Sequence, residues 1–161
     1  MPGWSRGRGL GLATAGGGRA TITGAGAAIT LGTDEVRLAV RALGRGDSRQ
    51  TFTDAALSEV GGEVRRALAE GVVEWWRSLP GGGLEHGVTI DARPRGTGAL
   101  VLHVAVAGDV AAHERSGDEV ELRRGDRVVT RYAHLVALDA TGARLPAHMS
   151  VADGRIVLSV D

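Results

Sequence analysis

The residues with the clearest chemical potential lie in two short stretches near the middle of the chain. The first, Glu74–Arg77, holds a pair of tryptophans between a carboxylate and a guanidinium, and the second, Glu85-His86, follows a proline-glycine turn. A carboxylate next to an imidazole can shift the pKa of both groups, as general acid–base catalysis requires. An exposed indole ring could instead stack on the face of a sugar. The candidate binding residues are therefore Trp75, Trp76, Glu74, Arg77, Glu85 and His86.

Around these six residues the sequence lacks the motifs S-x-x-K and H-E-x-x-H, which carry a nucleophile or a zinc ion. Aspartates recur in or beside turns, where Asp also bonds to the local backbone, and no D-x-D-x-D-G calcium loop is present. The histidines are scattered, with no pair at ligand spacing on one element: His86, His103, His113, His134 and His148. We therefore expect a protein that is not an enzyme and that has no catalytic residues, metal or other cofactor.

The amino-acid composition limits the classes of protein to which this chain can belong. The 161 residues suit a single β-rich domain, 1–161, that is long enough to bury a core. Cysteine is absent, so no disulfide stabilises this core. The single Phe and single Tyr leave aliphatic side chains and the tryptophans to fill the core. Basic and acidic residues balance at 19 each, so we expect no nucleic-acid partner. No run approaches the roughly 18–20 apolar residues of a membrane span, and the N-terminal stretch lacks the apolar segment of a signal peptide.

Short apolar runs recur between glycine-containing turns at intervals of roughly eight to twelve residues, which is typical of a sandwich or barrel. Asp153-Gly154 between two such runs indicates a hairpin, whereas the polar stretch Gly44–Ser48 indicates a surface loop. We therefore expect an all-β fold, an antiparallel β-sandwich of roughly ten or more short strands. Strands are expected at Leu10–Ala15, Ala20–Thr23, Ala27–Leu31, Val36–Leu43, Leu100–Ala107, Glu119–Arg123, Val128–Tyr132, Leu135–Asp139, His148–Val151 and Ile156–Val160.

The stretch from residue 54 to residue 79 is ambiguous by periodicity. Apolar residues near helical spacing favour one helix, which would make the protein α+β. Against a helix, Gly61-Gly62 and Gly71 would each cost about 1 kcal/mol relative to Ala inside it. The rival interpretation is a hairpin with strands at Glu63–Leu68 and Val72–Leu79. In that hairpin the two tryptophans would point to opposite faces, so that at most one is fully buried.

Two parts of the chain carry a family resemblance. The first reads VEWWRSLP from Val73, followed by GLEHGVTI from Gly83. The second comprises Thr130–Tyr132, Leu138–Ala147 and Gly154–Asp161. Together they resemble an uncharacterised β-rich module of large surface or secreted proteins in myxobacteria and similar bacteria, where it commonly precedes FG-GAP (integrin-α-like propeller) repeats. The chain departs from the family pattern at Ser78, His86 and Val88, where Asn, Gln and an aromatic residue are usual.

The resemblance implies strands over Glu63–Leu79, which favours the hairpin. It also implies an extracellular or cell-surface location and a structural or adhesion-related role without enzymatic activity. The alternative is a carbohydrate-binding module that uses an exposed tryptophan. The partner is thus expected to be a protein or glycan of unknown identity, and self-association through strand edges is a further expectation.

Overall fold

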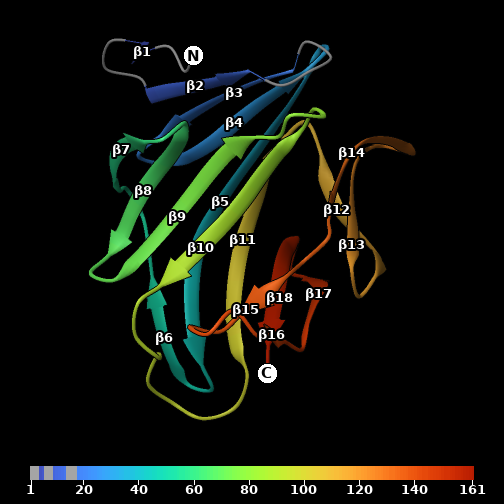
Figure 1. The fold of residues 1–161 in the computed structure, drawn as a ribbon. Helices are drawn as coiled ribbons and strands as arrows, with labels where there is room; N and C mark the ends of the chain where they lie inside the picture. Colours follow the sequence, from blue (N-terminus) through green and yellow to red (C-terminus); the bar gives the residue numbers. More distant parts are fainter. Residues whose placement is uncertain (1–3, 6–8, 14–17) are drawn as a thin grey trace. The chain divides into compact units, whose positions relative to one another are not determined.

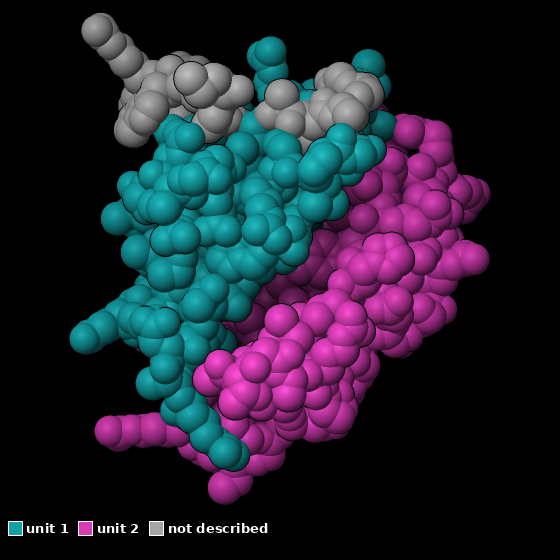
Figure 2. All heavy atoms as spheres, viewed as in Figure 1, with its two compact units in different colours: residues 1–39, 52–93 teal, residues 40–51, 94–161 magenta. Residues whose placement is uncertain are grey.

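The computed structural model describes residues 4–5, 9–13 and 18–161, and these residues form antiparallel β-strands without any helix (Figure 1). The prediction of an all-β fold is confirmed, and the alternative of a helix near 54–79 is wrong. In the described part of the chain there is accordingly no helix of the length and apolar character needed to cross a bilayer. Contacts divide the chain into two compact units, coloured separately in Figure 2: unit 1, Met1–Ala39 with Phe52–Arg93, and unit 2, Val40–Thr51 with Pro94–Asp161.

The first sheet of unit 1 is a meander of consecutive antiparallel strands. It forms because apolar and polar residues alternate: in the third strand Ala20 and Ile22 are buried while their neighbours are more exposed. The turn after that strand leads into Gly26, which has a φ of 136°. A side chain at that position would also overlap Ala39, so glycine is required there. The strands are β1 (Trp4–Ser5), β2 (Gly9–Ala13), β3 (Arg19–Thr23), β4 (Gly26–Leu31) and the first half of β5 (Asp34–Arg45).

The second sheet of unit 1 contains the ambiguous stretch and is built from three successive hairpins. Its order is β10-β9-β8-β7, with β7 at Ala56–Val60, β8 at Glu63–Ala69, β9 at Val72–Ser78 and β10 at Leu84–Ile90. Gly61, Gly62 and Gly71 lie in two of the three turns of this sheet, with φ values of 59°, 81° and 71°. The glycines that would weaken a helix are thus the residues that close the hairpins.

The core of unit 1 lies between its two sheets, so that this unit is a β-sandwich. Strand β2 contacts β7 and β9 of the facing sheet. Apolar side chains from both sheets and Phe52 from the segment that precedes β7 are buried, with Trp76 the largest of them: Leu10, Leu12, Ala20, Ile22, Ala27, Ile29, Val36, Leu38, Phe52, Val64, Val72 and Trp76. Because Phe and Tyr are so scarce, the buried indole of Trp76 fills space that other aromatic rings occupy in other cores.

Unit 2 contains the second half of β5, paired with β6 (Ser48–Thr51), and three groups of later strands. Strands β11 (Leu100–Gly108), β18 (Arg155–Val160) and β17 (Ala147–Ala152) are neighbours in that order. A three-stranded sheet, β12 (Ala111–Ser116), β13 (Glu119–Arg124) and β14 (Arg127–Ala133), contacts β17 through β12 and β13. Short strands β15 (Ala137–Leu138) and β16 (Arg144–Leu145) pair with each other. The buried residues include Leu102, Val104, Val120, Leu122, Met149, Ile156 and Leu158.

Every expected strand is present in whole or in part, whereas β1, β6, β7, β10, β12 and β16 were not among the strands expected. The predicted hairpin at Asp153-Gly154 is confirmed, with φ values of 51° and 71°. The predicted loop Gly44–Ser48 instead contains the end of β5, a two-residue turn and the start of β6. Strands β6 and β7 are largely exposed, so no apolar pattern marks them. Only Ala137–Leu138 is strand within Leu135–Asp139, and residues 14 and 15 of the first expected strand lie outside the described residues.

Candidate functional site

The six candidate residues lie on the hairpin of β9 and β10 but divide between its two faces. The register pairs Trp76 with His86 and Arg77 with Glu85. Because side chains alternate along a strand, Glu74, Trp76 and His86 share the inner face of the sheet, and Trp75, Arg77 and Glu85 share the outer face. The prediction that the two tryptophans point to opposite faces is confirmed. The six residues therefore form two separate groups rather than one pocket.

The inner group is a buried ion cluster centred on Glu74. One carboxylate oxygen, Oε2, accepts a hydrogen bond from Nη1 of Arg66, and the other, Oε1, lies 2.8 Å from Nε2 of His86. Arg66 also donates to two backbone carbonyls, through Nη2 to Gly24 at 2.8 Å and to Thr53 at 3.2 Å. The side chains of Arg66 and Glu74 are 0% exposed and that of His86 is 5% exposed. Each charged group of this cluster therefore has an ion-pair or hydrogen-bond partner inside unit 1.

Trp76 completes the inner group by stacking on the imidazole. The two ring centroids lie 3.9 Å apart with an interplanar angle of 12°. Trp76 is 1% exposed, so the indole covers the face of His86 and closes the cluster from solvent. Its Nε1 is buried without a hydrogen-bond partner among the described residues. The arrangement fixes the imidazole through its ring face and through Glu74, and it leaves no room for a substrate at that carboxylate.

Arg66 was not among the residues predicted from sequence. It is the partner that makes a buried Glu74 tolerable, because an unpaired buried carboxylate would cost several kcal/mol. A signal for it exists in the pattern: Arg66 has the same strand parity as Val64, which is fully buried in β8. An arginine at an inward position of an amphipathic strand indicates a buried acidic partner.

The outer group is organised around Trp75. Its ring lies over Gly87, the residue directly across the strand pair, and a Cβ atom on Gly87 would overlap the ring. The indole N–H donates to Oγ1 of Thr89 at 3.2 Å, which fixes the orientation of the ring. The guanidinium carbon of Arg77 lies 5.2 Å from the ring centroid, within cation–π range. The ring is therefore held flat on the sheet by its neighbours.

Charged side chains of both signs surround this ring. Arg77 Nε donates to Glu85 at 2.5 Å, and Arg65 Nε donates to Glu63 at 2.7 Å. The hydrogen bond to Glu85 raises the pKa of Arg77, and the charges of Glu85 and Glu63 add to the effect. Arg65 also lies directly across from Trp75 in the register of β8 and β9. The outer face thus offers one aromatic ring bordered by two guanidiniums and two carboxylates.

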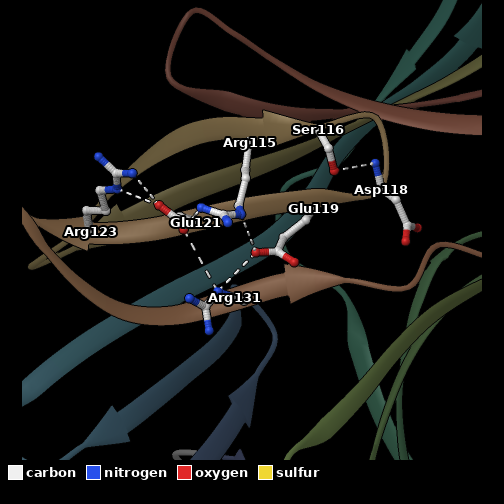
Figure 3. A network of polar contacts seen from close by, with 7 residues as sticks. All are labelled: Arg115, Ser116, Asp118, Glu119, Glu121, Arg123 and Arg131. Carbon is white, nitrogen blue, oxygen red and sulfur yellow. Dashed lines mark hydrogen bonds and ion pairs between the residues drawn. The ribbon is translucent and has the colours of Figure 1, made fainter.

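A second polar network, which the sequence did not indicate, lies on the β12–β14 sheet of unit 2. Figure 3 shows three arginines directed at Glu121 and Glu119. Glu121 Oε2 accepts from Nε of Arg123 at 2.7 Å, and Oε1 accepts from Nη1 of Arg115 at 3.1 Å. Arg131 Nε lies 3.0 Å from Glu119 Oε1. The hydrogen bond from Arg123 lowers the pKa of Glu121, and the positive charges of all three arginines contribute. Each of the three arginines therefore stabilises this face of the β12–β14 sheet through an ion pair with Glu119 or Glu121.

The histidines and aspartates form no metal site in the residues that the structure describes, because no three such side chains come together there. His103 projects from β11, and burial lowers its pKa, with smaller contributions from Arg49 and Arg155. Asp139 caps its own turn by accepting hydrogen bonds from the backbone N–H of Thr141 at 2.8 Å and of Ala143 at 3.0 Å. This is the local bonding that makes Asp common in turns.

The N-terminal stretch from residue 3 to residue 7, G-W-S-R-G, matches the spacing G-x-S-x-G of a nucleophile elbow. The elbow places its serine at a sharp turn from a strand into a helix. No helix occurs in the described part of the chain, and Ser5 belongs to strand β1. Residues 3, 6 and 7 lie outside the described residues. The spacing match therefore lacks the structural context that would give it meaning.

Comparison of the chain with known protein families, with curated proteins and with solved structures finds no significant match. The function is therefore inferred from the arrangement of the chain's own residues and from the family resemblance of residues 73–161.

Proposed function

We propose that the chain is a non-enzymatic structural or adhesion-related module of a bacterial surface or secreted protein. The observation that carries this proposal is the division of the candidate residues by the sheet. An acid–base site would need Glu74, Glu85 and His86 to meet at one substrate, but Glu85 lies on the opposite face from the other two. The carboxylate and imidazole that remain together are sealed in the core of unit 1.

The inner cluster supports a structural role. Both oxygens of Glu74 are engaged, and the whole side chain is inaccessible to solvent. A general acid or base must come within hydrogen-bond reach of a reacting group, and these groups are occupied by each other. Their contribution is to fix the hairpin of β9 and β10 against Gly24 and Thr53, which belong to other parts of unit 1.

The outer face supports an adhesive role. A rigid aromatic ring amid partly exposed charged groups is the kind of surface through which proteins recognise partners, since tryptophan and arginine dominate binding hot spots. Arg77 and Glu85 are 50% and 38% exposed, so both can meet a partner without unfolding the sheet. The family resemblance of residues 73–161 supports a location at the cell surface.

The proposal is tested by adhesion and by turnover on the same set of proteins. The chain is coupled to beads and its retention on bacterial cell envelopes is measured for wild type, for Arg77→Ala/Glu85→Ala, and for the control Arg37→Ala/Glu35→Ala. The control pair is also exposed and also 2.5 Å apart, but it lies on another strand of unit 1. We expect retention to fall only in the first double variant.

The same proteins are incubated with a panel of ester, peptide and glycoside substrates. We expect no turnover above that of a heat-denatured sample. Turnover that Glu74→Gln or His86→Gln abolishes, while far-UV circular dichroism remains that of wild type, would overturn the proposal. Equal retention of all variants on the envelopes would remove the adhesive role of the outer face.

A further inference from the structure

We propose that the outer face of the β7–β10 sheet binds an uncharged carbohydrate, with the indole of Trp75 stacked on one face of a pyranose ring. This inference rests on the adhesive role proposed above and names the class of ligand. It applies to the Trp75 platform, defined as Trp75 with the four charged residues that border it: Glu63, Arg65, Arg77 and Glu85.

The first argument is that the ring is already ordered. Gly87 lies beneath it, and the N–H group is bound by Thr89. An aromatic ring free to rotate would lose that freedom when a ligand stacked on it, whereas a fixed ring avoids the cost. The backbone beneath the ring also matters: any side chain at residue 87 would displace the indole from the sheet. The glycine at residue 87 therefore allows the indole of Trp75 to lie flat against the sheet.

The second argument is the balance of charge around the ring. The border contains two arginines and two glutamates, which neutralise one another in pairs. Such a border has no net field to attract a sulfate or uronate. It does present N–H donors and carboxylate acceptors side by side, and sugar hydroxyls both donate and accept hydrogen bonds. The chemistry that fits is a neutral sugar rather than a polyanion.

The third argument is accessibility. The side chains of Arg65, Arg77 and Glu85 are 42%, 50% and 38% exposed. The guanidinium of Arg77 lies over the ring at 5.2 Å from its centroid, within cation–π range, so a sugar that stacks on this face displaces it. A half-exposed side chain of this length can turn toward a hydroxyl of the ligand while its stem stays on the sheet.

The test is a binding titration of the full chain with defined sugars. Neutral hexasaccharides of glucose, mannose, xylose and galactose are titrated by isothermal calorimetry, and polygalacturonate and dextran sulfate serve as anionic comparisons. The variants are Trp75→Ala, Trp75→Phe, Arg77→Ala/Glu85→Ala and the control Arg37→Ala/Glu35→Ala. Circular dichroism of each variant establishes that it is folded.

We expect at least one neutral hexasaccharide to bind, and Trp75→Ala to weaken it by about tenfold or more, since an aromatic contact worth about 1.4 kcal/mol corresponds to that factor. Trp75→Phe, which keeps a ring, should retain part of the affinity, and the Arg37 control should match wild type. The affinity should change little with added salt, because the ligand is uncharged.

Three outcomes would overturn the inference: no neutral sugar binds, Trp75→Ala binds as tightly as wild type, or only the anionic polymers bind and salt abolishes their binding. If Trp75→Ala were to misfold, Trp75→Phe and the Arg77/Glu85 variant would decide between these outcomes. Retention on cell envelopes without sugar binding would refute the ligand class alone, whereas turnover would refute the non-enzymatic function itself.

Discussion

Glu74→Gln is the substitution that probes the buried cluster most directly. Glutamine has almost the size and shape of glutamate, so packing in the core of unit 1 is preserved while the negative charge is removed. Arg66 would then remain charged at 0% exposure with only uncharged acceptors, the amide oxygen of the glutamine and the backbone carbonyls of Gly24 and Thr53. Removal of one partner of a buried ion pair typically costs about 3–5 kcal/mol, because the other charge is left uncompensated.

That loss is large against the whole stability of a small protein, which is commonly about 5–15 kcal/mol. With a urea dependence of about 2 kcal/mol per molar, the unfolding midpoint should fall by roughly 1.5–2.5 M. The exposed pair Arg77–Glu85 provides the contrast within the same hairpin, so Glu85→Gln should leave the midpoint close to that of wild type.

Tryptophan fluorescence in urea measures this effect, and it reports on unit 1 because Trp4, Trp75 and Trp76 all belong to that unit. The fully buried Trp76 should give the main change in emission on unfolding. The double variant Arg66→Met/Glu74→Gln completes the cycle. It leaves no unpaired charge, so we expect it to be more stable than Glu74→Gln alone, with a coupling energy of about 1–3 kcal/mol.

The reasoning would be refuted by a loss below about 1 kcal/mol in Glu74→Gln, which would mean that Arg66 is not held as a buried charge. It would equally be refuted if the separate losses of Glu74→Gln and of Arg66→Met simply added in the double variant, since groups in direct contact should couple.

Three further predictions concern other parts of the chain. Gly87→Val should force the ring of Trp75 off the sheet, shift tryptophan emission to the red and cost about 1–3 kcal/mol in urea unfolding; an unchanged spectrum would contradict the close contact. Ile156→Ala, at a position 0% exposed in unit 2, should cost about 2–5 kcal/mol by circular dichroism, and a loss under about 0.5 kcal/mol would show that the position is not core. Hydrogen bonds, first that of the Thr141 hydroxyl, hold the pKa of Asp139 below its usual range. The stabilisation from Asp139 is therefore complete above the unfolded pKa of about 3.9 and is lost as the pH falls through the folded value, and Asp139→Asn should remove this part of the acid dependence. Carbon-detected NMR titration of the Asp139 carboxyl checks the direction, and a pKa at or above the unfolded value would contradict it.

The glycines show how much of the fold could be predicted from the sequence. Counted by helix propensity, Gly61, Gly62 and Gly71 only weakened the prediction of a helix over residues 54–79. In the structure they have positive φ and close two hairpins, which is a stronger reason for glycine than mere tolerance. Strands that lack apolar alternation, such as Ser48–Thr51, could not be predicted from the sequence, because backbone pairing rather than side-chain burial defines them.

The amino-acid sequence by itself determined most of the strands outside residues 54–79, the hairpin at Asp153-Gly154 and the fact that Trp75 and Trp76 face opposite ways once they lie in a strand. These features depend on local periodicity and turn chemistry, which a chain carries in its order of residues. Only the tertiary structure decided which tryptophan is buried, that Arg66 is the partner of Glu74, and that Glu85 is separated from His86. Those outcomes depend on which face of the sheet meets the rest of unit 1 and on contacts between residues far apart in sequence. The strand parity of Arg66 indicates that this residue is buried, but it does not indicate which carboxylate it contacts.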